Sequence, residues 1–86
     1  MNDKVLIKLN VPELDDTFEL FVPVNETVWK IERMINKALF EITNYLFPLE
    51  SNTLLMNSKS GYIYKDDEVL FDTDIRNTTE LVLVII

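Results

Sequence analysis

The last seven residues of the chain, Glu80 to Ile86, are apolar after the first and consist of leucine and β-branched side chains. A strand that is apolar on both faces lies in the interior of a sheet and not at its edge. A chain of 86 residues is smaller than most domains and leaves room for one hydrophobic core. The sequence therefore predicts one domain over residues 1–86, with the end of the chain as a central strand.

Two earlier segments have the alternating pattern of half-buried strands. Residues 4–11 and residues 17–24 each place apolar side chains at every second position. Residues 12–16 lie between them and are rich in turn-forming types. This part of the chain is predicted to form a hairpin.

The spacing of apolar residues then changes to three and four, which is typical of one face of an amphipathic helix. This pattern begins at Val28 and predicts a helix that runs to Thr43 or Asn44. Asn25 or Thr27 can cap the helix by accepting a hydrogen bond from a free N–H group of its first turn.

Two short strands are predicted after the helix, over residues 53–57 and 62–65. Between them stands Gly61, the one glycine of the chain, in a turn where a positive φ is expected. Residues 66–79 form a polar loop, which a few apolar side chains fasten to the core. Those side chains are Val69, Leu70 and Ile75.

A single helix covers only one face of a sheet, so its apolar stripe must pack on that face. The stripe consists of Val28, Ile31, Ile35, Ala38, Leu39 and Ile42, and its expected partners on the sheet are Val5, Ile7, Phe18 and Leu20. A central final strand fits beside and parallel to the first strand. The predicted fold is α+β, a β-grasp with a mixed sheet of four to five strands and one helix packed across one face.

The end of the chain, residues 70–84, resembles the end of ubiquitin-like domains, where a leucine, an aspartate and an isoleucine pin a loop before a Leu-x-Leu strand. Residues 53–56 resemble the third strand of those domains, and residues 27–31 resemble the start of their helix. The double-glycine tail used for conjugation does not follow Ile86 in this sequence, so a conjugation role is not expected.

Among ubiquitin-like proteins without that tail, the sequence is similar to the small YukD/EsaB type encoded with bacterial type VII (WXG100/ESX) secretion systems. The resemblance rests on size and on residues 5–9, 17–23 and 74–81. It implies an accessory or regulatory protein that acts through protein contacts. The expected location is the cytoplasm, with recruitment to a membrane complex of secretion components.

The amino-acid composition excludes several types of catalytic and binding site. Without cysteine or histidine, the chain has no disulfide, thiol nucleophile, zinc finger or Ser/Cys–His catalytic pair. A net charge of -7 opposes nucleic-acid binding, and no apolar run reaches the length that spans a bilayer. The acidic loop from Asp66 to Asp74 lacks the glycine and spacing of a calcium loop and is interpreted as solvated charge, with a metal site as the lesser alternative. We therefore expect no enzyme activity, catalytic residue, cofactor or metal, no nucleic-acid partner and no membrane insertion.

The candidate binding residues are those left apolar once the core is filled. The alternation of each strand predicts that they face away from the helix and meet on the outer face of the sheet. These residues are Leu6, Phe21, Leu55, Val82, Val84 and Ile86. The alternative is that Lys8, Asn10, Glu19 and Glu80 divide them into scattered single residues. A docking surface for a partner protein is favoured, and a homodimer through the same face is the second interpretation.

A second candidate surface lies on one flank of the helix, where Trp29, Asn36 and Phe40 follow one another at helical spacing. The alternative is that residues 45–48 fold back over them and form a satellite cluster.

Overall fold

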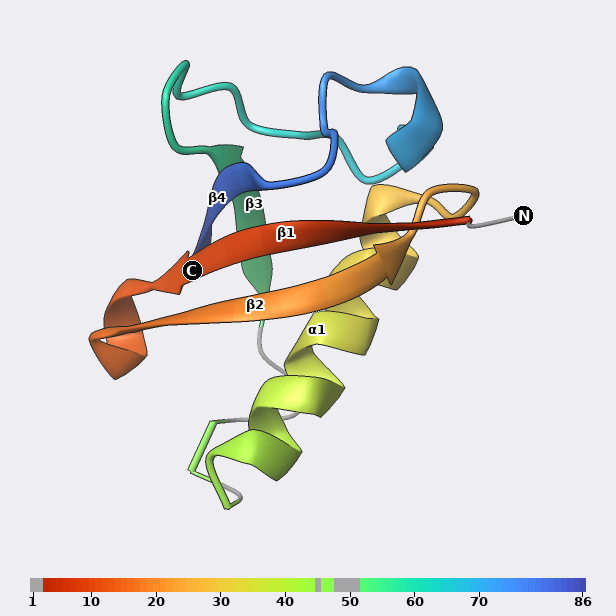
Figure 1. Cartoon of the computed structure of the whole chain (residues 1–86). Helices are drawn as coiled ribbons and strands as arrows, with labels where there is room; N and C mark the ends of the chain where they lie inside the picture. Colours follow the sequence, from red (N-terminus) through yellow and green to blue (C-terminus); the bar gives the residue numbers. More distant parts are fainter. Residues whose placement is uncertain (1–2, 45, 48–51) are drawn as a thin grey trace.

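The computed structural model describes residues 3–44, 46–47 and 52–86. Its sheet has four strands in the order β2-β1-β4-β3 (Figure 1). Their bounds are Lys4–Val11 for β1, Asp16–Pro23 for β2, Thr53–Asn57 for β3 and Thr79–Ile85 for β4. Strand β4 is parallel to β1 and antiparallel to β3. The predicted central position of the C-terminal strand is confirmed.

The predicted hairpin joins β1 to β2 in antiparallel register from Lys4–Pro23 to Val11–Asp16. A short 3-10 turn, Pro12–Leu14, connects the strands. Asp15 follows the turn with a φ of 51°, a left-handed conformation that aspartate tolerates because its short side chain can bond locally.

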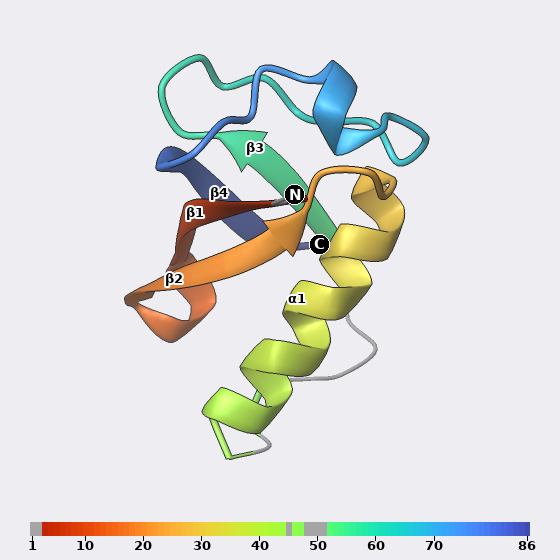
Figure 2. The ribbon, with the colours of Figure 1, turned by 45° about the vertical axis from the view of Figure 1, so that its right-hand side comes forward.

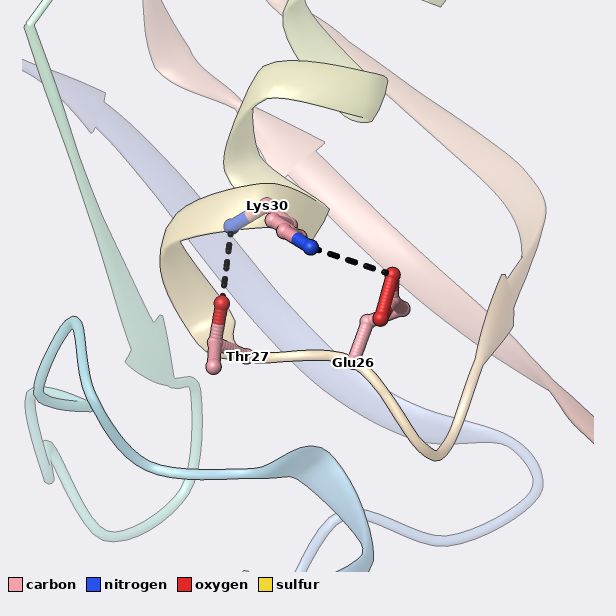
Figure 3. A network of polar contacts seen from close by, with 3 residues as sticks. All are labelled: Glu26, Thr27 and Lys30. Atoms are coloured by element: carbon pink, nitrogen blue, oxygen red, sulfur yellow. Dashed lines mark hydrogen bonds and ion pairs between the residues drawn. The ribbon is translucent and has the colours of Figure 1, made fainter.

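Helix α1 (Val28–Ile42) covers one face of the sheet (Figure 2). Of the two candidate caps, Thr27 performs the function, because its Oγ1 accepts a hydrogen bond from the Lys30 N–H at 3.3 Å. The Lys30 ammonium also lies 4.0 Å from the Glu26 carboxylate (Figure 3).

Most of the predicted helix stripe is buried, but Ile42 is 55 % exposed. The expectation for Ile42 was wrong because the last turn of α1 extends beyond the sheet, as both views show (Figures 1 and 2). Apolar spacing alone does not indicate where the covering surface ends. On the sheet side Ile7 is fully buried, and the other three expected partners are partly buried against the core; these are Val5, Phe18 and Leu20.

The long segment between β3 and β4 lies across one end of the sheet (Figure 1). The predicted strand over residues 62–65 was wrong in extent, since only a single bridge forms, between Ile63 and Met56. The chain leaves β3 after Tyr64 and turns to meet the start of α1, where the Val28 N–H donates to the Glu68 carbonyl. Gly61 has the expected positive φ, 76°.

The apolar side chains that were expected to pin the segment do so unequally: Leu70 and Ile75 are buried, and Val69 is half-buried. Within the segment the Thr73 hydroxyl donates to the Leu70 carbonyl and accepts from the Ile75 N–H.

Candidate functional site

The outer face of the sheet is opposite α1, and the strand register fixes which side chains occupy it. Leu6 pairs with Phe21 across β1 and β2, and β4 contributes Val82 and Val84. These four face away from α1 as predicted, and Phe21 is 65 % exposed. Ile86 follows β4 and is also exposed.

Leu55 does not belong to this face. It is fully buried and pairs with Leu83, which is also fully buried. The assignment from alternation was wrong by one residue, and a one-residue error exchanges the two faces of a strand. Leu54 and Met56 are the outward side chains of β3, opposite Val84 and Val82. Since β3 is apolar at three consecutive positions, only its pairing with β4 reveals the orientation.

A row of charged residues divides the outer face. Lys8 lies between Glu19 on β2 and Glu80 on β4, its partners in register on either side. This row separates Leu6 and Phe21 from the apolar side chains at the other end of β3 and β4. We call that second group the β3–β4 patch; it consists of Leu54, Met56, Ile63, Val82 and Val84. The apolar side chains of the outer face therefore form two groups, one on each side of the charged row.

The helix flank does not form a continuous exposed line. Trp29 is 48 % exposed, and the Arg33 guanidinium lies 5.2 Å from the centre of its ring, within cation–π range. Asn36 is buried and Phe40 is half-buried. Of the segment expected to fold back, Phe47 is buried in the core, while Tyr45 and Pro48 lie outside the described residues.

Beside Trp29 the surface is hollowed into a groove of about 750 Å³ between α1 and the edge strand β3. We call it the α1–β3 groove. Its lining includes Trp29, Glu32, Arg33 and Lys37 from α1, Thr53 and Leu54 from β3, and Asp66 and Ile86.

Glu32 was missed by the sequence analysis. It is only 7 % exposed, and its carboxylate accepts hydrogen bonds from the Thr53 hydroxyl, at 3.2 Å, and from the Leu55 main chain. Burial raises its pKa to about 7, with Asp66 adding to the rise and the two hydrogen bonds opposing it. A signal was present, because Glu32 is four residues after Val28 and therefore lies beside the apolar stripe.

Glu32 gives the groove a carboxyl group that exchanges a proton near neutral pH, with no cysteine or histidine in the chain to act beside it. Within the described parts of the chain, no group of three or more acidic side chains is placed to hold a metal ion. No described helix is long and apolar enough to cross a membrane.

Solved structures identify the fold. A chain of the MycP5-free ESX-5 inner membrane complex aligns with 99 % of this chain at a TM-score of 0.80 and 16 % identity. The ubiquitin-like domain of Plasmodium falciparum Dsk2 aligns with 96 % at 0.66 and 19 % identity, and that match covers 99 % of the Dsk2 chain. The ubiquitin-like domain of an Arabidopsis thaliana protein aligns with 98 % at 0.66 and 20 % identity, over 79 % of its own length.

The chain has the ubiquitin-like β-grasp fold. It spans about a fifth of the ESX-5 chain, 21 % of that length. No family model and no curated protein matches the sequence.

Proposed function

We propose that the protein is a non-enzymatic, ubiquitin-like accessory protein of a bacterial type VII secretion system, of the YukD/EsaB type, acting through protein contacts. The observation that carries the proposal is the alignment of nearly the whole chain with part of an ESX-5 membrane-complex chain. The sequence resemblance over residues 5–9, 17–23 and 74–81 supports it independently. Its place is the cytoplasmic side of the membrane complex, to which it is recruited by binding.

The β3–β4 patch is the docking surface in this proposal. It is the continuous apolar part of the outer face, and the Lys8 and Glu80 row forms a charged border on one side. Contiguous apolar surface on a soluble domain usually marks a contact site, and a charged border favours one orientation of the partner. The helix flank at Trp29 and Phe40 and the pair Leu6 and Phe21 lie outside this patch.

The test is a double substitution, Leu54→Lys with Val84→Lys, in a tagged protein purified from its native host. Both side chains face away from α1, so the added charges stay hydrated in the free protein and lose that hydration in an interface. We expect co-purified type VII secretion components to fall by at least tenfold, with an unchanged circular dichroism spectrum. Leu6→Lys with Phe21→Lys is the matched control, because it makes the same apolar-to-lysine change at an opposed outward pair on the other side of the Lys8 and Glu80 row.

If the double variant folds and retains its secretion components, the β3–β4 patch is not the docking surface. If light scattering shows a wild-type dimer that the variant loses, and no secretion component co-purifies with wild type, the homodimer replaces the proposal. A gene for a WXG100 protein and one for a membrane ATPase beside this gene would strengthen it.

A further inference from the structure

Strand β3 is an edge strand whose own chain covers only part of its open side. The Ile86 N–H donates to the Asn52 carbonyl, and the Ser58 N–H donates to the Glu80 carbonyl. Antiparallel hydrogen-bonded pairs alternate along a ladder. The main-chain groups of Thr53, Leu55 and Asn57 therefore point away from β4, towards the open side.

The segment that includes Ile63 covers the far end of that side. There the Asn57 N–H donates to the Tyr62 carbonyl, and the Tyr64 N–H donates to the Leu55 carbonyl. After Tyr64 the chain leaves β3, and the Glu32 carboxylate accepts the next donor, the Leu55 N–H. The ladder position that follows is Thr53, whose N–H and C=O have no hydrogen-bond partner among the described residues. It faces the α1–β3 groove.

The charge of the groove differs from that of the whole protein. The chain carries 15 acidic and 8 basic residues, yet Arg33 and Lys37 both line the groove. The two acidic groups beside them are Asp66 and Glu32, and the proton affinity of Glu32 leaves it only partly ionised near neutral pH. Although the molecule as a whole is acidic, Arg33 and Lys37 can attract an acidic ligand to this groove.

We propose that the α1–β3 groove binds an extended, acidic segment of a partner protein, which pairs its main chain with Thr53 as an added strand on β3. Open main-chain groups on an edge strand are completed by another extended main chain. Arg33 and Lys37 select the acidic side chains, and the exposed part of Trp29 supplies an apolar contact beside them. A lipid headgroup or a nucleic acid matches the cations but cannot complete the ladder.

Glu32 limits this binding in the free protein. Its carboxylate occupies the Leu55 N–H, which an added strand could otherwise use, and places a negative charge beside the incoming acidic segment. Glu32→Gln keeps an oxygen for the Thr53 hydroxyl and the Leu55 N–H and removes that charge. The variant is therefore expected to bind an acidic segment more tightly than the wild-type protein does.

The test uses a capped eight-residue peptide that alternates valine with glutamate, added to the whole protein. Trp29 is the one tryptophan, so its fluorescence reports groove binding, and amide NMR shifts report pairing at Thr53. We expect shifts at Thr53 and Leu55, and Arg33→Glu or Lys37→Glu to weaken binding by roughly three- to tenfold. Lys59→Glu is the matched control, because it makes the same charge change in the turn after β3 and should alter affinity by less than about twofold. Glu32→Gln should strengthen binding by a smaller factor than Lys37→Glu weakens it, because it removes at most one negative charge whereas Lys37→Glu changes the charge by two.

Two further peptides separate strand pairing from charge. One alternates valine with lysine, and the other keeps the glutamates but has N-methylated main-chain amides in its centre. Both should fail to shift the Thr53 amide. Absence of a Thr53 shift with millimolar glutamate peptide overturns the proposal. Equal binding of the N-methylated peptide also overturns it, because the groove would then recognise anionic charge without a strand. Leu54 lines the groove as well as the β3–β4 patch, whereas Val84 belongs to the patch alone. The single variant Val84→Lys therefore separates the two proposals, because it should lose secretion components and still show the Thr53 shift with the glutamate peptide.

Discussion

The two faces of the β3–β4 pair carry the same kinds of side chain in different surroundings. Leu55 and Leu83 face α1 and are fully buried, whereas Leu54 and Val84, one residue away on each strand, face outward and keep part of their surface exposed. Apolar character therefore does not distinguish the core from the surface in this strand pair. The position of α1 does, because a single helix covers only one face of the sheet.

The largest difference in stability is expected when a charge is placed on each of the two faces. Leu55→Asp buries an unpaired carboxylate and should cost more than about 4 kcal/mol, enough to prevent folding of a small domain. Leu54→Asp leaves its carboxylate in water and should cost less than about 1 kcal/mol. Urea denaturation followed by circular dichroism measures both. Similar losses for the two variants would mean that the faces are assigned wrongly.

The next effect concerns volume alone. Leu83→Ala removes buried methyl groups from the centre of the sheet and leaves a cavity beneath α1, so we expect a loss of about 2–5 kcal/mol in the free energy of unfolding. The same truncation at Leu54, Leu54→Ala, serves as the control and should cost clearly less. A loss near zero at Leu83 would contradict its place in the core.

A smaller effect comes from the open edge of β3, where Glu32 bridges helix and sheet. Its pKa is about 7 in the folded protein and near 4.5 when unfolded, so the folded state holds the proton more tightly. The contribution of protonated Glu32 to the free energy of unfolding is complete below pH 4.5 and is lost as the pH rises from there through about 7. The loss is on the order of 1–2 kcal/mol after solvent screening.

Unfolding measured at intervals between pH 4 and 8 should show this decline in the wild type and a flatter profile in Glu32→Gln. Other carboxylates also titrate over part of that range, so the informative quantity is the difference between the two profiles. If the profiles coincide, Glu32 ionises normally and its burial has been compensated.

The smallest expected effect is on the outer face. Val84→Thr exchanges an outward methyl group for a hydroxyl and keeps the β-branched shape that favours a strand. The stability should change by less than about 0.5 kcal/mol. A threonine one residue earlier, Leu83→Thr, would bury its hydroxyl, because Leu83 is fully buried. A large loss at Val84 would indicate that another part of the chain covers the outer face.

Much of the fold could be predicted because short-range sequence patterns specify its helix and strands. The alternation of residues 4–11, the helical spacing from Val28 and the apolar final strand each depend on neighbours a few positions away, and together they allowed one order of strands. The site was less predictable. The charged row through Lys8 and the burial of Glu32 both join residues from different strands or from helix and sheet.

The sequence by itself determined the helix, the four strands of the sheet, the central place of β4 and the β-grasp class, because alternation and helical spacing report how much of each element is covered. Tertiary structure alone decided which face of β3 is covered, where α1 runs past the sheet at Ile42, and why Glu32 is buried. The physical reason is that Thr53–Asn57 is apolar at three successive positions, so both orientations satisfy its local pattern. Only pairing with β4 beneath a single helix places Leu55 inside and leaves Leu54 outside.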